Sequence, residues 1–128
     1  MTTTNIYILS LESDKFYVGK SAHVMERYQQ HIDGEGSSWT RKYKPTAIIK
    51  VIEDASPFDE DRITKEWMAK YGIDNVRGGS YSSERLSQMH RDTLQREIWA
   101  AQDCCLLCGK KGHFANECRI AKKRYDYC

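Results

Sequence analysis

Residues 5–20 read NIYILSLESDKFYVGK, in which two runs of β-branched and aromatic residues flank the polar segment 12–15. Such runs are typical of strands and the polar segment is typical of a turn, so the stretch predicts a β-hairpin. Side chains alternate across a strand, and with an odd number of residues in the loop Tyr7 and Tyr17 share one face. In the register of a five-residue loop, Tyr7 faces Gly19, where the absent side chain leaves bare backbone that a ligand can approach.

The segment after the hairpin predicts a helix and then a strand. Ser21 is a plausible N-cap for a helix over residues 22–32, in which apolar side chains recur at four-residue spacing from Val24 to Ile32. Residues 46–52 read TAIIKVI and form the most apolar run of the chain. We expect this run to be the central strand of a sheet.

Two further helices are predicted in the second half of the chain. The first begins at Ser56, with Pro57 at the first helical position and Asp59 at capping-box spacing. Residues 73–81 are rich in turn-forming types, and a second helix covers about residues 84–102, where apolar side chains recur at four-residue steps. The sequence therefore predicts an α/β (α+β) fold with a small three-stranded mixed or antiparallel sheet flanked by helices.

The size and composition of the chain fit one ordinary globular domain. It has 128 residues, of which 40% are hydrophobic and 30% are charged. No run of 18 apolar residues is present to span a membrane, and residues 1–5 lack the basic and apolar regions of a secretory signal. We expect an intracellular protein of the nucleus or cytoplasm that has no membrane partner.

All five cysteines lie in the last quarter of the chain. A disulfide framework would spread its cysteines through the fold, whereas clustering beside a histidine favours a metal site in a reducing compartment. Four side chains follow one another with intervals of two, four and four residues, and they are Cys105, Cys108, His113 and Cys118. Three sulfurs and one nitrogen suit a closed tetrahedral Zn²⁺ site, which so short a segment needs in order to fold.

A second set of chemically reactive side chains lies within the first 75 residues: Tyr7, Tyr17, Lys20, Arg27, His31, Glu66 and Asn75. Tyrosine, arginine, histidine and one carboxylate are the groups that a metal-assisted phosphodiester hydrolase uses. Arg27 and His31 are four residues apart, so they share a helical face and reach a common point. Taken singly, each residue is an ordinary core aromatic or solvated helix residue, and only their joint order favours a reaction site.

Over about residues 5–80 the chain resembles the GIY-YIG nuclease family. Asn5-Ile6-Tyr7 stands where the family name has Gly-Ile-Tyr, and Tyr17-Val18-Gly19 forms the second motif. The resemblance implies that Lys20, Arg27, His31, Glu66 and Asn75 belong to the catalytic site with the two tyrosines, Asn75 holding local geometry.

The resemblance, combined with chemistry, implies a role for each group. Glu66 holds one divalent cation, Mg²⁺ or Mn²⁺, that polarises the scissile phosphate and stabilises the leaving oxygen. Arg27 neutralises charge on the phosphoryl oxygens. Tyr7 activates or positions the attacking water, with Tyr17 beside it and His31 as the alternative proton acceptor.

The cysteine and histidine segment resembles the zinc knuckles of retroviral nucleocapsid proteins. Leu106 stands where an aromatic residue often follows the first cysteine, so stacking on an unpaired base falls mainly to Phe114. The basic residues around it predict salt-sensitive nucleic-acid binding, and they include Lys110, Lys111, Lys122, Lys123 and Arg124. A protein partner bound through the knuckle is the alternative. Trp39, in the loop before the apolar strand, is expected to pack under that loop, with base stacking as the alternative.

The sequence therefore predicts a metal-dependent endonuclease that hydrolyses DNA, with branched or single-stranded DNA among its candidate substrates and RNA not excluded. Its parts are a nuclease domain over 1–83, a helical connector over 84–103, and a zinc knuckle with a basic tail over 104–128. The alternative function is a catalytically inactive module that binds nucleic acid through the knuckle. Chains that pair these two modules resemble proteins of large DNA viruses and of some eukaryotes.

Overall fold

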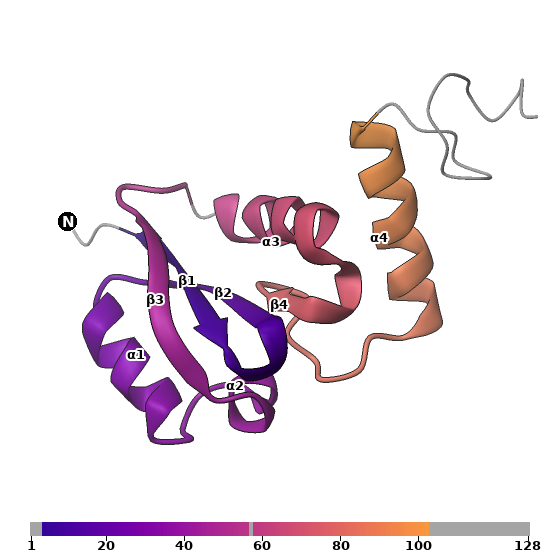
Figure 1. Cartoon of the computed structure of the whole chain (residues 1–128). Coiled ribbons are helices and arrows are strands. Elements are labelled where there is room, and N and C mark those ends of the chain that lie inside the picture. The colour runs from indigo at the N-terminus through magenta and orange to yellow at the C-terminus, as the bar shows by residue number, and fades with distance from the viewer. Residues whose placement is uncertain (1–3, 57, 103–128) are drawn as a thin grey trace, which may run out of the picture. The chain divides into compact units, whose positions relative to one another are not determined.

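The computed structural model of the chain describes residues 4–56 and 58–102 (Figure 1). Contacts within the chain divide it into two units, Met1–Leu86 and Ser87–Cys128. The predicted zinc ligands and basic tail lie outside the described residues, so these calls stay predictions. They are Cys105, Cys108, His113, Cys118, Phe114, Lys110, Lys111, Lys122, Lys123 and Arg124.

The predicted hairpin forms the centre of the first unit. Strand β1 (Asn5–Leu11) pairs antiparallel with β2 (Lys15–Ser21), and the three residues Glu12–Asp14 connect them in a short 3₁₀ turn. Tyr7 lies opposite Gly19 in this register, as the alternation of the sequence predicts. The two tyrosines therefore project from neighbouring strands on the same face of the sheet.

The sheet has four strands in the order β3-β1-β2-β4, one more than predicted. The apolar run forms β3 (Pro45–Ile52), which lies at the edge of the sheet beside β1 and not at its centre, so the prediction of a central strand was wrong. Exposure of Ile49 and Val51 follows from this edge position. The added strand, β4 (Val76–Gly78), runs parallel to β2 and ends opposite Val18.

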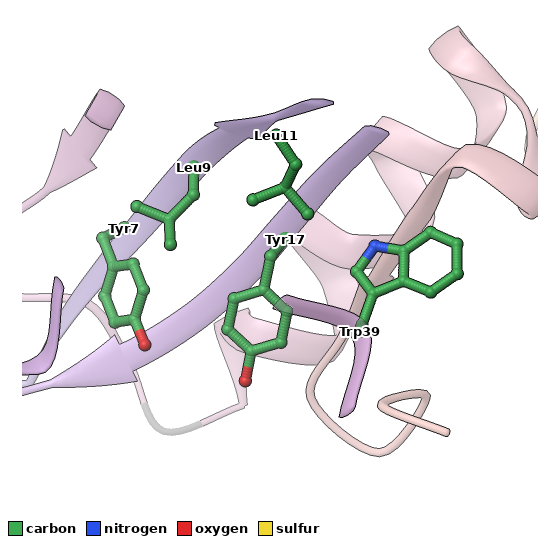
Figure 2. Close-up of a cluster of buried hydrophobic side chains, with 5 residues drawn as sticks. All are labelled: Tyr7, Leu9, Leu11, Tyr17 and Trp39. Carbon is green, nitrogen blue, oxygen red and sulfur yellow. The ribbon is translucent and has the colours of Figure 1, made fainter. Parts of the chain in front are cut away.

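Two helices pack on the face that carries the tyrosines. Helix α1 (Val24–Ile32) begins after His23, whose backbone N–H is bound by the hydroxyl of Ser21, and α2 (Ser38–Lys42) is a five-residue helix that was not predicted. The hydroxyl of Ser37 accepts the backbone N–H of Thr40 and so caps α2. Figure 2 shows the core on this face, made by Tyr7, Leu9, Leu11, Tyr17 and Trp39.

Helix α3 (Asp59–Tyr71) covers the opposite face of the sheet. It contacts β2 and β4, and Trp67 and Tyr71 lie with ring centroids 5.4 and 4.6 Å from that of Phe16. The carboxylate of Asp59 accepts the backbone N–H of Ser56, as in one half of a capping box, whereas the hydroxyl of Ser56 accepts the N–H of Phe58. The helix ends at Gly72, whose positive φ of 103° a glycine adopts without strain.

The described part of the second unit is helix α4 (Gln88–Ala101). It begins four residues later than predicted, because the hydroxyl of Ser87 accepts the backbone N–H of His90 and caps the first turn. In the described part of the chain, no helix has the length and apolar character needed to cross a membrane.

Candidate active site

Tyr7 and Tyr17 form the floor of the candidate site. Their ring centroids are 6.3 Å apart and both side chains are buried. A Cβ atom at Gly19 would overlap the ring of Tyr7, so the glycine makes room for the tyrosine itself. The space over Gly19 that sequence analysis left for a ligand is therefore filled by a side chain of the protein.

His31, at the end of α1, contacts both tyrosines. Its Nε2 lies 2.8 Å from Oη of Tyr7, and its ring centroid is 4.9 Å from that of Tyr17. The other ring nitrogen, Nδ1, lies 3.0 Å from the hydroxyl oxygen of Thr40. Burial, followed by the charge of Arg27, lowers the pKa of His31 to about 4, so the imidazole is neutral at neutral pH.

Arg27 lies one helical turn before His31, and its charge acts on both tyrosines. Burial raises the pKa of Tyr7 and of Tyr17, which disfavours phenolate, whereas the guanidinium of Arg27 opposes that rise at both positions. The guanidinium of Arg27 donates a hydrogen bond of 2.7 Å to the side chain of Gln30 on the same helix. The geometry therefore brings together four of the predicted site residues, Tyr7, Tyr17, Arg27 and His31.

A carboxylate that sequence analysis did not select joins this group. Glu60, in the first turn of α3, is one of the charges that raise the pKa of Tyr7 and Tyr17. The nearby backbone N–H of Lys20 slightly lowers its pKa. Strand β4 ends opposite Val18, so it does not pair with β2 at Lys20. Burial, followed by the neighbouring charge of Asp61, raises the pKa of Glu60, while Lys20 lowers it.

The position of Glu60 is fixed by the residue that follows it. Both carboxylate oxygens of Asp61 accept hydrogen bonds from Ser80, at 2.7 Å from the backbone N–H and at 2.8 Å from the hydroxyl. These bonds tie the first turn of α3 to the turn after β4, where Gly79 has a positive φ of 51°. Glu60 is thereby held at the open edge of β2.

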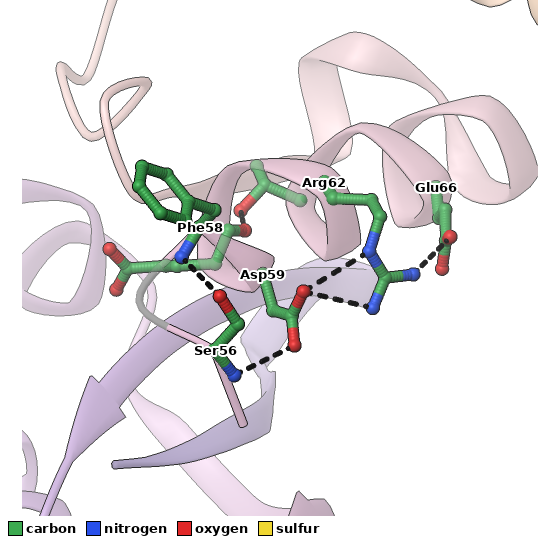
Figure 3. A network of polar contacts seen from close by, with 7 residues as sticks. Ser56, Phe58, Asp59, Arg62 and Glu66 are labelled. Atoms are coloured by element: carbon green, nitrogen blue, oxygen red, sulfur yellow. Dashed lines mark hydrogen bonds and ion pairs between the residues drawn. The ribbon is translucent and has the colours of Figure 1, made fainter.

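Glu66, the carboxylate predicted as the metal ligand, lies elsewhere on α3. Its Oε1 is 2.7 Å from Nη1 of Arg62, which also bonds Asp59, and Figure 3 shows this exposed row along the helix. Six residues separate Glu60 from Glu66, which corresponds to a rotation of about 120° around the helix. The structure therefore does not group Glu66 with the tyrosines, and its role as metal ligand stays a prediction.

The last two predicted residues lie at opposite ends of β2. Lys20 is exposed beside Glu60, and its charge acts on that carboxylate. Asn75 accepts a hydrogen bond of 2.6 Å from Nζ of Lys15 and donates one of 2.7 Å to the carbonyl of Tyr71. Lys15 is five residues from Lys20, about 16 Å along the strand, so Asn75 holds the turn between α3 and β4.

The residues present fit one hard divalent cation. Among residues 4–56 and 58–102, no group of three or more metal-binding side chains surrounds a common point. Mg²⁺ does not need such a cage, because it keeps several waters and binds through one or two carboxylates together with substrate phosphates. Glu60 offers one half-buried carboxylate, whose pKa is raised mainly by burial.

Three residues of the site escaped sequence analysis. Glu60 belongs to the run Asp59-Glu60-Asp61, which is ordinary for the first turn of a helix. Ser37 and Thr40 lie in a segment with no strong helical pattern. The signal in the sequence that could have identified Glu60 is its position in the first turn of a predicted helix. Side chains there tilt towards the N-terminal end of the helix.

Comparisons with known proteins place this site in context. A model described as the GIY-YIG catalytic domain matches residues 4–71 of the chain. A UPF0213 protein of Cupriavidus necator is 32% identical over 44 residues, which are 34% of this chain and 48% of that relative. The match thus spans about half the length of the relative. No solved structure matches the chain.

Proposed function

The chain belongs to the GIY-YIG family of nucleases, and from this premise we propose that it is an endonuclease that hydrolyses DNA with one divalent cation held by Glu60. The family assigns the class of reaction, and a nuclease domain implies a nucleic-acid substrate. The cation, the DNA and the residues that act on them are the proposed part. The observation that supports the proposal is the contact of His31 with Tyr7 and Tyr17. The charges of Arg27 and Glu60 both act on these two tyrosines.

The side chains divide the reaction between them. Tyr7 orients the attacking water and takes its proton, and Tyr17 lies beside it in the floor of the site. Arg27 neutralises charge that develops on the phosphoryl oxygens, which is the largest electrostatic demand of the transition state. Lys20, exposed next to Glu60, attracts the phosphate backbone. A divalent cation, when bound to Glu60, polarises the phosphate and stabilises the leaving oxygen.

Glu60 is proposed in place of Glu66 on electrostatic grounds. Glu60 interacts with both tyrosines and with Lys20, and burial makes its ionised form costly in the absence of a cation. Glu66 is exposed and already paired with Arg62. A cation at Glu60 therefore relieves an existing cost and lies within range of the reacting groups, whereas a cation at Glu66 does neither.

The test uses two matched variants of the full chain. Purified protein is incubated with single-stranded, duplex, nicked, flapped and four-way DNA in Mg²⁺, and Glu60→Gln is compared with Glu66→Gln. Glutamine preserves the shape of the side chain, so Glu60→Gln keeps the fold. We expect cleavage to be lost in Glu60→Gln and kept in Glu66→Gln. Cleavage lost in Glu66→Gln and kept in Glu60→Gln would assign the metal site to Glu66. A wild-type chain that cleaves none of these substrates would contradict the proposed nuclease function.

We also propose that Cys105, Cys108, His113 and Cys118 bind zinc and that Phe114 with the nearby basic side chains strengthens the hold on nucleic acid. The spacing of the ligands supports this proposal. One Zn²⁺ per chain is expected by elemental analysis, and Cys105→Ser with Cys118→Ser is expected to weaken DNA binding. Unchanged DNA affinity with loss of a bound protein would instead assign the knuckle to a protein partner.

A further inference from the structure

A continuous row of hydrogen bonds links Tyr7 to the backbone of the loop before α2. The phenol oxygen of Tyr7 lies 2.8 Å from Nε2 of His31. Nδ1 of His31 lies 3.0 Å from the hydroxyl of Thr40, which lies 3.1 Å from the carbonyl oxygen of Ser37. His31 and Thr40 are each 1% exposed. The row is therefore buried at its centre, and every proton in it needs an acceptor within the row.

The carbonyl end of the row fixes the direction in which its hydrogen bonds point. A carbonyl oxygen only accepts, so the hydroxyl proton of Thr40 belongs to its bond with Ser37. Thr40 can then only accept from Nδ1–H of His31, and Nε2 of His31 accepts the proton of the Tyr7 hydroxyl. Each donor has an acceptor in this arrangement, so the neutral imidazole carries its proton on Nδ1.

The opposite arrangement fails at Tyr7. If the hydroxyl of Thr40 donated to Nδ1, the proton of His31 would lie on Nε2 and point at the phenol oxygen. That oxygen would then accept from His31, and the proton of the buried Tyr7 hydroxyl would lose its acceptor in the row. A buried polar group left unpaired costs about 1–3 kcal/mol, so this tautomer is disfavoured.

Neighbouring backbone keeps the row in place. Ser37 binds the backbone N–H of Thr40 through its side chain at 3.2 Å, and its carbonyl oxygen also accepts the backbone N–H of Arg41. A Cβ atom at Gly36 would overlap the ring of His31, so the loop packs directly against the imidazole. The hydroxyl of Thr40 is thus presented to Nδ1 from a capped helix, and turning away would break its own bond to the carbonyl oxygen of Ser37.

We propose that Thr40 is a positioning residue that holds the proton of His31 on Nδ1, so that Nε2 is free to receive the proton of Tyr7 during hydrolysis. The proposal rests on the nuclease function proposed above. In the step, the water oxygen bonds to phosphorus and the bond to the leaving oxygen breaks, with its electron pair remaining on that oxygen. One proton of the water passes to Oη of Tyr7, and the proton of Tyr7 passes to Nε2 of His31.

This relay removes the difficulty of using a buried tyrosine as a base. Burial raises the pKa of Tyr7, so a free phenolate is scarce, but a tyrosine that gives up one proton as it receives another never becomes a free phenolate. The imidazolium formed at His31 is a strong acid in this setting, because burial and Arg27 lower its pKa to about 4. It returns its proton readily to Oη of Tyr7, which lies 2.8 Å away and passes a proton back to solvent, and this resets the site.

The tautomer can be measured without any reaction. In the full chain labelled with ¹⁵N, nitrogen NMR distinguishes the protonated from the unprotonated ring nitrogen of His31 at neutral pH. We expect Nδ1 protonated and Nε2 unprotonated in the wild type and in Thr40→Ser. In Thr40→Val, which keeps the shape but removes the hydroxyl, we expect a substantial population of the Nε2–H form. A wild-type His31 protonated on Nε2 would overturn the proposal, even if the valine variant failed to fold.

Kinetics give the second measurement. Thr40→Val is expected to lower kcat by up to about 100-fold, the lower end of what a general base contributes, with KM and DNA affinity unchanged. Thr40→Ser is expected to restore wild-type kcat. Wild-type cleavage by the valine variant would contradict the positioning role. If the wild-type chain has the Nδ1–H tautomer but cuts no DNA, the proposed function fails while the assignment of the proton stands.

Discussion

The ring of Tyr7 lies directly against the backbone of Gly19, its partner in the neighbouring strand. The contact leaves no room for even one added carbon atom. It holds the phenol in the position where Oη lies within hydrogen-bond distance of Nε2 of His31. Cross-strand packing in the hairpin therefore sets the position of the hydroxyl that we assign to the attacking water.

Substitution of this glycine should displace the tyrosine. Gly19→Ala is expected to lower the free energy of unfolding by about 1–3 kcal/mol through overpacking, and to abolish cleavage because Tyr7 moves off His31. Chemical denaturation and a cleavage assay measure the two effects. Gly34→Ala is the control, since Gly34 has open space but a φ of 80°. It should cost about 1–2 kcal/mol and leave kcat unchanged. Normal cleavage by Gly19→Ala would show that Tyr7 does not need its present position.

The buried imidazole should make stability depend on pH. The pKa of His31 falls from 6.5 to about 4 on folding, so between these values the unfolded chain holds a proton that the folded chain does not. The contribution of His31 to the free energy of unfolding is therefore complete above pH 6.5 and is lost as the pH falls towards 4. The groups around His31 in this window are the cationic Arg27 of α1, the neutral Tyr7 and Tyr17, and Thr40.

The measurement compares denaturation midpoints across the same pH range in two variants. His31→Gln is expected to flatten the slope between pH 6.5 and 4, whereas His23→Gln, at an exposed position before α1, should leave the wild-type slope. Equal slopes in the wild type and His31→Gln would show that His31 titrates normally in the folded chain.

Arg77 should be a strong determinant of stability. It is buried over the ring of Trp39, with 4.6 Å from its guanidinium carbon to the ring centroid, and it donates to the carbonyl oxygens of Ile73, Val76 and Ser83. Arg77→Met keeps the volume but leaves these carbonyls without their donor, and it should cost about 2–4 kcal/mol. Thermal denaturation checks this. Lys42→Met, which removes an exposed ion pair with Glu84, should shift the midpoint very little.

Asn75 should matter for stability and not for the reaction. Its two hydrogen bonds join Lys15 to the end of α3, so Asn75→Ala is expected to cost about 1–2 kcal/mol at unchanged kcat. Cleavage measured well below the melting temperature separates the two effects. A large fall in kcat at unchanged stability would instead give Asn75 a part in the chemistry.

The sequence predicted what depends on local pattern. The register of the hairpin followed from the alternation of residues 5–20, because a slip of one residue would have turned Tyr7 to the other face. Spacing also predicted that Tyr7 and Tyr17 share one face of the hairpin and that Arg27 and His31 share one face of a helix. The roles of these four residues in a reaction stay predictions.

What the sequence did not predict depends on contacts between distant segments. The position of β3 at the edge is decided by which strand pairs with β1, and its apolar character did not reveal that. Strand β4 has three residues and no strand-like pattern of its own. The choice between Glu60 and Glu66 depends on how α3 is rotated against the sheet, and two glutamates on one helix look alike in sequence.

The shortness of β4 has a consequence for experiments. Strand β4 stops opposite Val18 and does not extend along β2 as far as Lys20, whose backbone N–H is near enough to Glu60 to lower the pKa of that carboxyl. The charge on Glu60 therefore acts on a main-chain amide just beyond the end of the β2–β4 ladder. In a nitrogen–proton NMR spectrum of the intact protein, the chemical shift of the Lys20 amide should therefore change with the charge on Glu60 as cations or DNA are added.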